Sequence, residues 1–444
     1  MKCMEKDVYK SSQYNIFFED KAGVTLLYNT FTTALIKLTK EKAEKIKITL
    51  KLNDLNELET DEYNLLINNG FIINNKINEI DQVKFRYYRG VFNSRDFRVT
   101  IVPTLNCNLN CPYCFERDKR DENITLKEYE EIYKFIDKQL FICQPNDFGI
   151  SWYGGEPLLE VDTIENISNK IDIICKNNNI KRACDSIVTN GYLLDEDCAK
   201  RLFNCGIKKI QITLDGDRDA HNKQRILKNG EGTFDKILNS IIIAQRYFEL
   251  VTVRFNTNKS NHEGIVRLLK NKSDIFNKNN IVISVGRLKN YLGGIVSKEN
   301  DNDCLNGFEL QNIQGYIDNY YKRVKTVNKM PIQIKHTNCG AESHKCFIIG
   351  PKLKIYKCAE ALGYSDSVGF IVDGDFQPNE VFWQWFNYNI FNNNEKCMSC
   401  KYVPMCMGGC PSSRKRLGIP NNEICGYWEQ WLNIKFNELI NTLN

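Results

Sequence analysis

Six short apolar segments alternate with helical patterns between residues 98 and 285, and this alternation constrains the fold more than any other feature. Apolar periodicity predicts helices near 126–141, 161–176, 194–205 and 233–248, with weaker ones near 262–270 and 308–325. Strands that alternate with helices form parallel sheets. Six such units over about 200 residues fit an incomplete, TIM-like (β/α)6 barrel, with chemistry on the loops after the strands. The candidate strands are Arg98–Val102, Gly149–Trp152, Ser186–Val188, Lys209–Leu214, Val251–Phe255 and Ile281–Val285.

A cysteine-rich loop follows directly after the first of these strands. Cys107, Cys111 and Cys114 form a CxxxCxxC motif, with Tyr113 before the third cysteine. Three thiolates in one loop can converge on one metal centre, whereas four would close a structural zinc site or an ordinary [4Fe–4S] site. Three ligands leave one iron of a cubane open to a small molecule. A zinc site with a distant fourth ligand is the alternative interpretation.

The motif resembles the signature of the radical S-adenosylmethionine enzymes. The resemblance implies that the open iron chelates the amino and carboxylate groups of S-adenosylmethionine. It further implies a 5′-deoxyadenosyl radical that abstracts a substrate hydrogen, so that Cys107, Cys111 and Cys114 would be catalytic as well as metal ligands. In such enzymes the cofactor supplies the chemistry, while the protein supplies position and excludes water.

Motifs at the ends of later strands are similar to those of the same family. Residues 154–157 resemble its GGEP motif, in which glycines allow close backbone approach. Residues 211–216 resemble its SLDG motif with Thr for Ser, and His221 and Arg225 follow at the family's usual spacing. The cofactor-binding residues that the resemblance implies are Tyr113, Gly154, Gly155, Glu156, Ser186, Thr189, Asn190, Arg254 and Asn256.

Eight cysteines lie between residues 339 and 425, in a stretch with little regular periodicity. The CxxCx5CxxxC spacing over 397–410, followed by one later cysteine, resembles the SPASM domain of radical enzymes that modify peptides and proteins. The resemblance implies two auxiliary [4Fe–4S] clusters, in addition to the first, and a tail whose folding depends on metal. Auxiliary cluster I would use Cys339, Cys346, Cys358 and Cys410, and auxiliary cluster II Cys397, Cys400, Cys406 and Cys425.

Two alternatives for this tail stay open. The spacing from Cys346 to Cys358 is short for the family, so auxiliary cluster I could lack Cys346 and leave an iron free to bind a substrate thiolate. Two structural zinc sites are the other alternative. The remaining cysteines show no ligand spacing and are predicted to be small buried hydrophobes: Cys143, Cys175, Cys184, Cys198, Cys205 and Cys304.

Residues 1–90 resemble a small winged-helix module. Strand-like runs at 14–18 and 24–28 flank a turn, helical patterns follow near 31–38 and 60–68, and 71–76 looks like a wing hairpin. In this position the module looks like the leader-binding element of ribosomal peptide maturases, which would hold a leader peptide as an added strand on a sheet edge. A passive cap on the barrel is the alternative.

These features together predict five parts of the chain. They are a leader-recognition domain (1–90), a radical barrel (95–300), a bridging region (301–335), a SPASM domain (336–428) and a C-terminal helix (429–444). Helical spacing predicts a packing face on that last helix, formed by Leu432, Phe436, Leu439, Ile440 and Leu443.

The resemblance points to a peptide maturase that installs thioether cross-links in a ribosomally made, Cys-rich precursor peptide of ranthipeptide or sactipeptide type. A carbon–carbon cross-linking maturase, an anaerobic sulfatase-maturating enzyme and a non-catalytic iron–sulfur or zinc scaffold are the alternatives. Sulfatase-maturating enzymes typically carry Asp directly after the cysteine equivalent to Cys358, where this chain has Ala359 and then Glu360. Glu360 is therefore a candidate proton acceptor from position alone.

Composition sets the remaining expectations. Eighteen cysteines in 444 residues, with a charged N-terminus, indicate a reducing cytoplasm and metal or redox chemistry. No apolar stretch approaches the length of a membrane span, and the net charge of +5 is spread along the chain, so neither membrane nor nucleic acid is an expected partner. The expected partners are a precursor peptide with a leader and an external one-electron donor of flavodoxin or ferredoxin type.

Overall fold

The computed structural model divides the chain into two compact units. One contains residues 1–92, 322–339 and 388–444, and the other contains 93–321 and 340–387. The helix expected near 308–325 falls largely outside the residues that the structure describes. Those residues are 8–20, 23–93, 95–116, 121–288, 303–305, 309–310, 313–315, 317, 336–337, 339–362, 366–392, 394–418 and 425–443.

The larger unit is built on a sheet that, in the described part of the chain, has the strand order β13-β12-β11-β10-β8-β6-β14-β15-β16-β17. Six of these strands follow one another in sequence order, and every neighbouring pair among them is parallel. They are β6 (Arg98–Ile101), β8 (Ile150–Trp152), β10 (Asp185–Thr189), β11 (Ile207–Thr213), β12 (Leu250–Thr257) and β13 (Ile281–Arg287). All six predicted strands are thereby confirmed.

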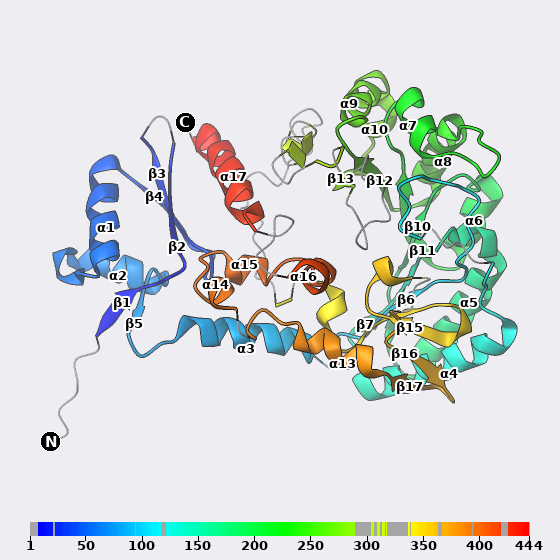
Figure 1. Cartoon of the computed structure of the whole chain (residues 1–444), viewed down its shortest axis with the longest axis horizontal. Helices are drawn as coiled ribbons and strands as arrows, with labels where there is room; N and C mark the ends of the chain where they lie inside the picture. Colours follow the sequence, from blue (N-terminus) through cyan, green and yellow to red (C-terminus); the bar gives the residue numbers. More distant parts are fainter. Residues whose placement is uncertain are drawn as a thin grey trace. The chain divides into compact units, whose positions relative to one another are not determined.

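Helices connect the parallel strands and lie along the outer side of the sheet (Figure 1). The five longer ones confirm the predicted helices and are α4 (Leu126–Cys143), α5 (Val161–Asn177), α6 (Glu196–Asn204), α8 (Phe234–Tyr247) and α9 (His262–Asn271). The shorter α7 (Arg218–Gln224) and α10 (Ser273–Phe276) were not predicted, because one or two turns carry little periodicity. Consecutive parallel strands joined by helices give the connectivity expected for a (β/α)6 unit.

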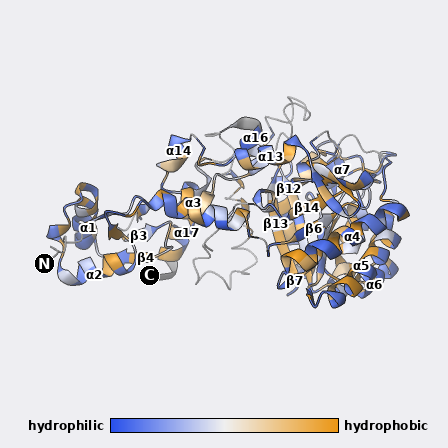
Figure 2. Cartoon of the chain, turned by 90° about the horizontal axis from the view of Figure 1, so that it is seen from below, coloured by the Kyte–Doolittle hydropathy of each residue, from blue (hydrophilic) through white to orange (hydrophobic). Residues whose placement is uncertain are grey.

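Strand and helix residues pack into one large hydrophobic core. Ile101, Ile212 and Val253 on the strands and Ile136 and Ile171 on the helices are fully buried within it. Figure 2 shows the same concentration of hydrophobic residues along the central strands. Along β10 and β12 buried and partly exposed side chains alternate, so one face of each strand supplies the apolar side chains of this core.

An ion pair fixes the amino end of β10. Asp185 is fully buried, and its two oxygens accept bonds from the Arg182 guanidinium at 2.6 and 2.7 Å. The same carboxylate accepts the Ile150 backbone N–H at 2.7 Å. Asp185 therefore ties β8 to β10 at the amino ends of these strands, opposite the carboxyl ends where chemistry is expected.

The first half of the cysteine-rich tail extends this sheet. β14 (Cys346–Ile349) pairs in parallel with β6, and β15 (Lys354–Tyr356), β16 (Gly369–Val372) and β17 (Asp375–Pro378) continue as an antiparallel series. The sequence did not predict these strands, because runs of three or four residues show little alternation. The helix α13 (Glu380–Asn387) follows β17.

The smaller unit contains a three-stranded antiparallel sheet of β2 (Asn15–Glu19), β3 (Thr25–Asn29) and β4 (Leu35–Leu38). A second pair is formed by β1 (Tyr9–Ser11) and β5 (Ile72–Asn74). Its helices are α1 (Lys40–Leu52), α2 (Thr60–Asn68) and α3 (Glu79–Val91). The predicted strands and the helix near 60–68 are confirmed.

Two predictions for this unit were wrong. Residues 31–38 form a turn and β4 rather than a helix, because the turn residue Thr33 has a φ of 64° and the side chains after it alternate between the two faces. Residues 71–76 do not form a hairpin of their own, since β5 pairs with β1, which lies more than sixty positions earlier. A hairpin prediction considers only neighbouring segments, so it could not find this partner.

The C-terminal helix α17 (Tyr427–Leu443) covers one face of the three-stranded sheet. Leu26 and Tyr28 of β3 pack against Leu432, Phe436 and Ile440. This confirms the predicted packing face, although the side chain of Leu443 lies outside the described residues. The intervening residue of β3, Leu27, points to the other face and packs against α1. The N-terminal and C-terminal segments thus share one layered unit.

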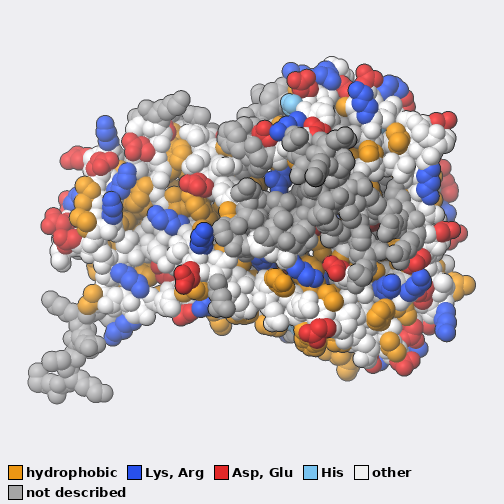
Figure 3. Space-filling model, in the orientation of Figure 1, with side chains coloured by type: hydrophobic (Ala, Val, Ile, Leu, Met, Phe, Trp, Pro, Cys, Tyr) orange, Lys and Arg blue, Asp and Glu red, His pale blue; other side chains and the backbone are white. Residues whose placement is uncertain are grey.

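The remaining short elements are β7 (Asp147–Phe148), β9 (Lys181–Arg182) and the 3-10 helices η1 (Leu55–Glu57), η2 (Pro157–Glu160), η3 (Gly340–Glu342), η4 (Pro351–Leu353) and η5 (Ala359–Ala361). On the face drawn in Figure 3, basic and acidic side chains are interspersed rather than gathered by sign. None of the helices in the described residues is long and apolar enough to cross a membrane.

Candidate active site

A pocket lies at the carboxyl ends of the parallel strands, where a barrel of this type is expected to carry its chemistry. Its lining brings together residues from the carboxyl ends of the parallel strands and from the loops that follow them. Among them are Cys107, Cys111, Tyr113, Cys114, Gly154, Gly155, Thr189, Asn190, Thr213, Arg225 and Asn256. Nine of the residues that the sequence suggested for the first cluster and the cofactor therefore meet in one cavity.

The cysteine loop is shaped by its own backbone. Cys107 is buried, and its Sγ accepts the Leu109 backbone N–H at 3.4 Å, while the Cys114 N–H bonds to the Cys111 carbonyl at 3.1 Å. The Asn190 amide, which follows β10, lies 3.8 Å from the Cys107 sulfur. The loop thus exposes its thiols to the pocket from a fixed backbone.

Two glycines let the loop after β8 lie directly against the cysteine loop. A Cβ on Gly155 would lie 2.2 Å from the Asn106 carbonyl oxygen and 2.6 Å from that of Leu105. A Cβ on Gly154, whose φ is +138°, would lie 2.5 Å from the Thr104 oxygen. The sequence suggested that these glycines make room for the cofactor. The structure shows that they also make room for the backbone that carries the cysteines.

Glu156 does not line the pocket but is buried beneath it. Its carboxylate accepts bonds from the Thr189 hydroxyl at 2.6 Å, the Asn190 backbone N–H at 2.7 Å and the Leu158 N–H at 3.0 Å. Burial raises the pKa of Glu156, although these bonds oppose the shift. The side chain therefore acts on the pocket through Thr189 and Asn190, which it holds at the end of β10.

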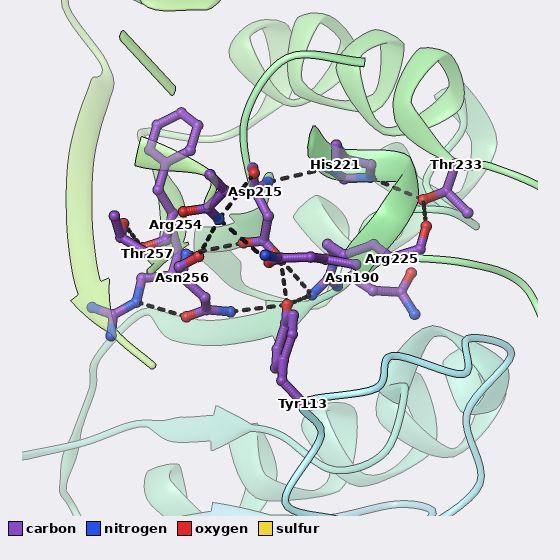
Figure 4. Close-up of polar contacts among 12 residues, drawn as sticks. Tyr113, Asn190, Asp215, His221, Arg225, Thr233, Arg254, Asn256 and Thr257 are labelled. Atoms are coloured by element: carbon purple, nitrogen blue, oxygen red, sulfur yellow. Dashed lines mark hydrogen bonds and ion pairs between the residues drawn. The ribbon is translucent and has the colours of Figure 1, made fainter. Parts of the chain in front are cut away.

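Tyr113 joins the cysteine loop to the ends of β11 and β12 (Figure 4). Its hydroxyl donates to the Asp215 carboxylate and accepts bonds from Arg225 at 2.8 Å and from the Asn256 amide at 3.2 Å. Asp215 in turn accepts the Asn256 backbone N–H at 2.9 Å. Burial, together with Asp215, raises the pKa of Tyr113 well above its ordinary value of 10, so the hydroxyl keeps its proton.

His221 supports the same loop from behind. Its Nδ1 accepts the Asp215 backbone N–H at 3.1 Å, and its Nε2 lies 2.9 Å from the Thr233 hydroxyl, which donates to the Arg225 carbonyl at 2.7 Å. This pattern requires a proton on Nε2 and none on Nδ1. Burial lowers the pKa of His221 well below 6.5, with Arg225 adding to the effect, so the ring is neutral.

Besides Glu156, two predicted cofactor residues lie outside the pocket lining. Ser186 is in the middle of β10, with its hydroxyl 3.1 Å from that of Ser151 on β8. The Arg254 guanidinium bonds to Ser284 at 3.0 Å and packs closely on Gly286 of β13. Both lie on strand faces, whereas the neighbouring Asn256 reaches the pocket.

Four of the tail cysteines belong to the same part of the smaller unit. Cys397 and Cys406 lie on the short helices α14 (Glu395–Met398) and α15 (Val403–Cys406), Cys400 lies between them, and Cys425 directly precedes α17. Burial and the proximity of Cys406, Cys400 and Cys425 raise the pKa of Cys397 to about 12. Burial likewise raises the pKa of Cys406 to about 11, with Cys400 and Cys425 contributing. Cys397, Cys400 and Cys406 are half-buried, and Cys425 is exposed.

The other four tail cysteines are distributed differently. Cys346 opens β14 and Cys358 precedes η5, both in the larger unit, whereas Cys339 and Cys410 belong to the smaller one. A Cβ on Gly340, next to Cys339 in the chain, would lie 2.9 Å from the Cys346 sulfur. Cys410 caps the helix α16 (Pro411–Leu417).

Glu360 lies in η5 and is partly exposed. Among the described residues, no three His, Cys, Asp or Glu side chains are close enough to hold a single metal ion.

The cysteines without ligand spacing mostly pack as hydrophobes. Cys143, Cys175, Cys198 and Cys205 are buried in the core of the larger unit, as predicted. The prediction was wrong for Cys184, which is exposed because it lies in the turn between β9 and β10. Cys304 is half-buried.

Comparison with known proteins identifies the class of the larger unit. Residues 101–270 match the model of the radical SAM superfamily, so this part of the chain is a radical SAM domain. Domains of this superfamily use S-adenosylmethionine and a [4Fe–4S] cluster, and the three-cysteine loop and its pocket fit that pair.

Relatives and solved structures are similar over most of the chain. A cysteine-type anaerobic sulfatase-maturating enzyme of Clostridium novyi (strain NT) is 25% identical over 346 residues, which are 71% of this chain and 87% of that enzyme. Native anSMEcpe with bound AdoMet and Cp18Cys peptide matches with a TM-score of 0.60 and 20% identity, over 78% of this chain and 98% of its own. Streptococcus suis SuiB bound to precursor peptide SuiA matches with a TM-score of 0.55 and 16% identity, over 94% and 99%.

Sequence reasoning missed Asp215 and Thr213 as parts of the site and gave His221 and Arg225 no role. The SLDG-like motif and the spacing that follows it were the available signals. Such motifs locate residues after a strand, but they do not show which side chain turns toward the cysteine loop.

Proposed function

We propose that the protein is a radical S-adenosylmethionine maturase that installs thioether cross-links in a ribosomally made, Cys-containing precursor peptide. The observation that carries the radical chemistry is the pocket in which three cysteines of one loop face Gly154, Gly155 and Asn190. Support for a peptide substrate comes from the similar structures, which hold the Cp18Cys peptide and the precursor peptide SuiA.

The residues of the larger unit fit the proposed cofactors. Cys107, Cys111 and Cys114 would hold one [4Fe–4S] cluster, and the backbone at Gly154 and Gly155 would lie beside S-adenosylmethionine. When bound, the pair supplies a 5′-deoxyadenosyl radical that abstracts a substrate hydrogen. The protein fixes the cysteine loop through Tyr113 and surrounds the reacting groups with pocket walls that exclude water.

The tail would hold two auxiliary clusters, for three in total. Cys397, Cys400, Cys406 and Cys425 are proposed for auxiliary cluster II because their spacing in the sequence resembles that of SPASM domains. Cys339, Cys346, Cys358 and Cys410 are proposed for auxiliary cluster I, with Cys346 the ligand that the family spacing supports least. An external donor of flavodoxin or ferredoxin type would supply electrons.

The three-stranded sheet offers an edge for a leader peptide. In the described residues β4 has one strand neighbour, β3, and the ladder bond from the Asn29 N–H to the Ala34 carbonyl at 3.0 Å sets its register. Because hydrogen-bonded pairs alternate along an antiparallel ladder, the backbone groups of Leu35 and Lys37 point away from β3. A peptide could add there as a further strand. Residues 1–90 are thus the proposed leader-recognition domain.

A sulfatase-maturating activity is the second candidate, because the relative from Clostridium novyi has it by name. Two observations favour the peptide maturase. The Asp typical of sulfatase-maturating enzymes after the third tail cysteine is Ala359 here, followed by Glu360. The SuiB fold extends over 94% of this chain, whereas that of anSMEcpe extends over 78%.

The test begins with the reduced, iron-loaded protein in the absence of oxygen. It should release 5′-deoxyadenosine from S-adenosylmethionine, and a chain that releases none would exclude every catalytic candidate. Cys-containing peptides encoded beside its gene should then lose two hydrogens. Loss of alkylation by iodoacetamide at the peptide cysteines indicates a thioether, retained alkylation indicates a carbon–carbon bond, and formylglycine indicates the second candidate.

A further inference from the structure

Arg225 is a buried charge at the pocket to which the proposed function assigns no role. Its side chain is 8% exposed and lines the pocket beside the cysteine loop. One guanidinium nitrogen donates to the Tyr113 hydroxyl at 2.8 Å and lies 3.8 Å from the Asp215 carboxylate. The Nε–H is buried and has no hydrogen-bond partner among the described residues.

An elaborate set of bonds holds this side chain in place (Figure 4). The Arg225 backbone N–H bonds to the His221 carbonyl at 2.8 Å, and the Arg225 carbonyl accepts the Thr233 hydroxyl at 2.7 Å. His221 links Thr233 to the Asp215 backbone. These bonds fix the backbone at the end of α7, while the bond to Tyr113 and the nearby Asp215 carboxylate hold the guanidinium at the pocket.

The position of Arg225 is costly unless it serves a bound group. Removing a guanidinium from water costs several kcal/mol, and an unpaired buried donor costs about 1–3 kcal/mol more. Asp215 offsets the first cost but leaves the Nε–H unpaired. Unsatisfied buried groups of this kind are rare and call for a functional reason. Arg225 and Cys111 line the same pocket, and Arg225 bonds to Tyr113, which lies between Cys111 and Cys114 in the cysteine loop.

We propose that Arg225 is a positioning residue whose positive charge stabilises the reduced form of the cluster held by Cys111 and its two partners. This inference rests on the proposed function, since it requires a [4Fe–4S] cluster at that loop. Reduction adds a negative charge to the cluster, and a nearby fixed cation favours the more negative state, most strongly in a buried site. Arg225 thereby raises the reduction potential, and Asp215, with the opposite charge, lowers it. Glu116 is a further acidic residue on the pocket wall and stays unchanged in the test.

The test is a redox titration of the full chain loaded with iron and sulfide, followed by electron paramagnetic resonance without S-adenosylmethionine. The signal of the first cluster is defined by its absence from a C107A/C111A/C114A variant. Arg225→Gln should shift its midpoint potential to more negative values, whereas Arg225→Lys, which keeps the charge, should stay near the wild type. The matched control is Arg182→Gln, which also breaks an Arg–Asp pair, but at the amino ends of the strands, away from the pocket. It should lower the melting temperature and leave the potential unchanged.

An unchanged potential in Arg225→Gln would overturn the inference, and so would an equal shift in Arg182→Gln. If Arg225→Gln does not fold, Asp215→Asn replaces it in the test. Asparagine has nearly the same shape as aspartate, and the expected shift of the potential has the opposite sign. The potential of Asp215→Asn should become less negative, and no change would count against the inference. A wild-type protein whose signals match those of the triple cysteine variant would instead refute the proposed function.

Discussion

Alanine at Gly155 should disrupt the cofactor site while leaving the rest of the larger unit folded. The added Cβ would lie 2.2 Å from the Asn106 carbonyl oxygen, whereas carbon and oxygen normally approach to about 3.3 Å. The two backbones must therefore separate by about 1 Å. That separation would stretch the bond from the Glu156 N–H to the Asn106 carbonyl, now 2.8 Å, beyond hydrogen-bonding distance.

The loss of folding free energy can be worked out from the overpacking and from the lost hydrogen bond. Overpacking costs about 1–3 kcal/mol, and the lost hydrogen bond adds about 1 kcal/mol. The cluster-free Gly155→Ala protein should thus lose about 2–4 kcal/mol in urea unfolding. Because the displaced segment leads directly into Cys107, the loaded protein should also lack the iron of the first cluster, a third of the total if three clusters are present, and should release no 5′-deoxyadenosine.

Gly206→Ala is the matched control. Gly206 has a φ of +95° and open space around its Cβ position, so alanine there adds only backbone strain of about 1–2 kcal/mol. Gly206 directly precedes β11, at the amino end of the strand and away from the pocket. The iron content of the Gly206→Ala protein should therefore equal that of the wild type. A Gly155→Ala protein with full iron content and normal cleavage of S-adenosylmethionine would refute the close-approach argument.

Three further expectations concern the supports of the site and the tail. Asp185→Asn leaves the buried Arg182 charge short of a partner and should cost about 3 kcal/mol in urea unfolding; a loss below about 1 kcal/mol would contradict the role of the pair. The lowered pKa of His221 means that protonation favours the unfolded chain, so the free energy of unfolding should fall as the pH drops below about 6.5. His221→Gln should lose less of this free energy than the wild type over the same pH range. An equal dependence on pH in the two proteins would contradict the prediction. Cys397→Ala should raise hydrogen exchange in β3, because Met405, from the segment proposed to hold auxiliary cluster II, packs against Leu26 of that strand. Cys107→Ala should leave this exchange unchanged, and equal exchange in the two variants would exclude the link.

The sequence predicted the parallel sheet because each strand has apolar side chains on its buried face and because helices with a clear apolar periodicity separate the strands. It failed for β4, where strand alternation follows a turn at Thr33, and for β14, which joins the barrel sheet from more than 240 residues away. Both failures involve partners or backbone angles that local patterns do not contain.

In the candidate site, too, the sequence located some residues but could not show the direction of their side chains. Motif spacing located the three cysteines, Tyr113 and the two glycines, and the structure brings them to one pocket. Spacing could not show that Glu156 turns inward to hold Thr189, or that the Tyr113 hydroxyl meets Asp215, because side-chain direction depends on neighbours that are distant in sequence.

The packing of the smaller unit decides how leader binding should be tested. Removing residues 1–90 would uncover α17 and Met405, which lies between two of the cysteines proposed for auxiliary cluster II and packs against Leu26. The deletion should therefore also cost the protein iron, and its loss of activity would say little about leader recognition. Lys37→Pro removes one outward N–H of β4 and leaves the ladder to β3 intact, since proline is tolerated on sheet edges.

The paired variant Lys37→Ala removes the side chain but keeps that N–H. If the leader adds as a strand at β4, Lys37→Pro should lose modification of the precursor peptide while keeping the release of 5′-deoxyadenosine and the iron content of the wild type. Lys37→Ala should retain modification. Equal modification by the two variants would exclude this edge as the binding site, and equal loss in both would assign recognition to the lysine side chain instead of the backbone.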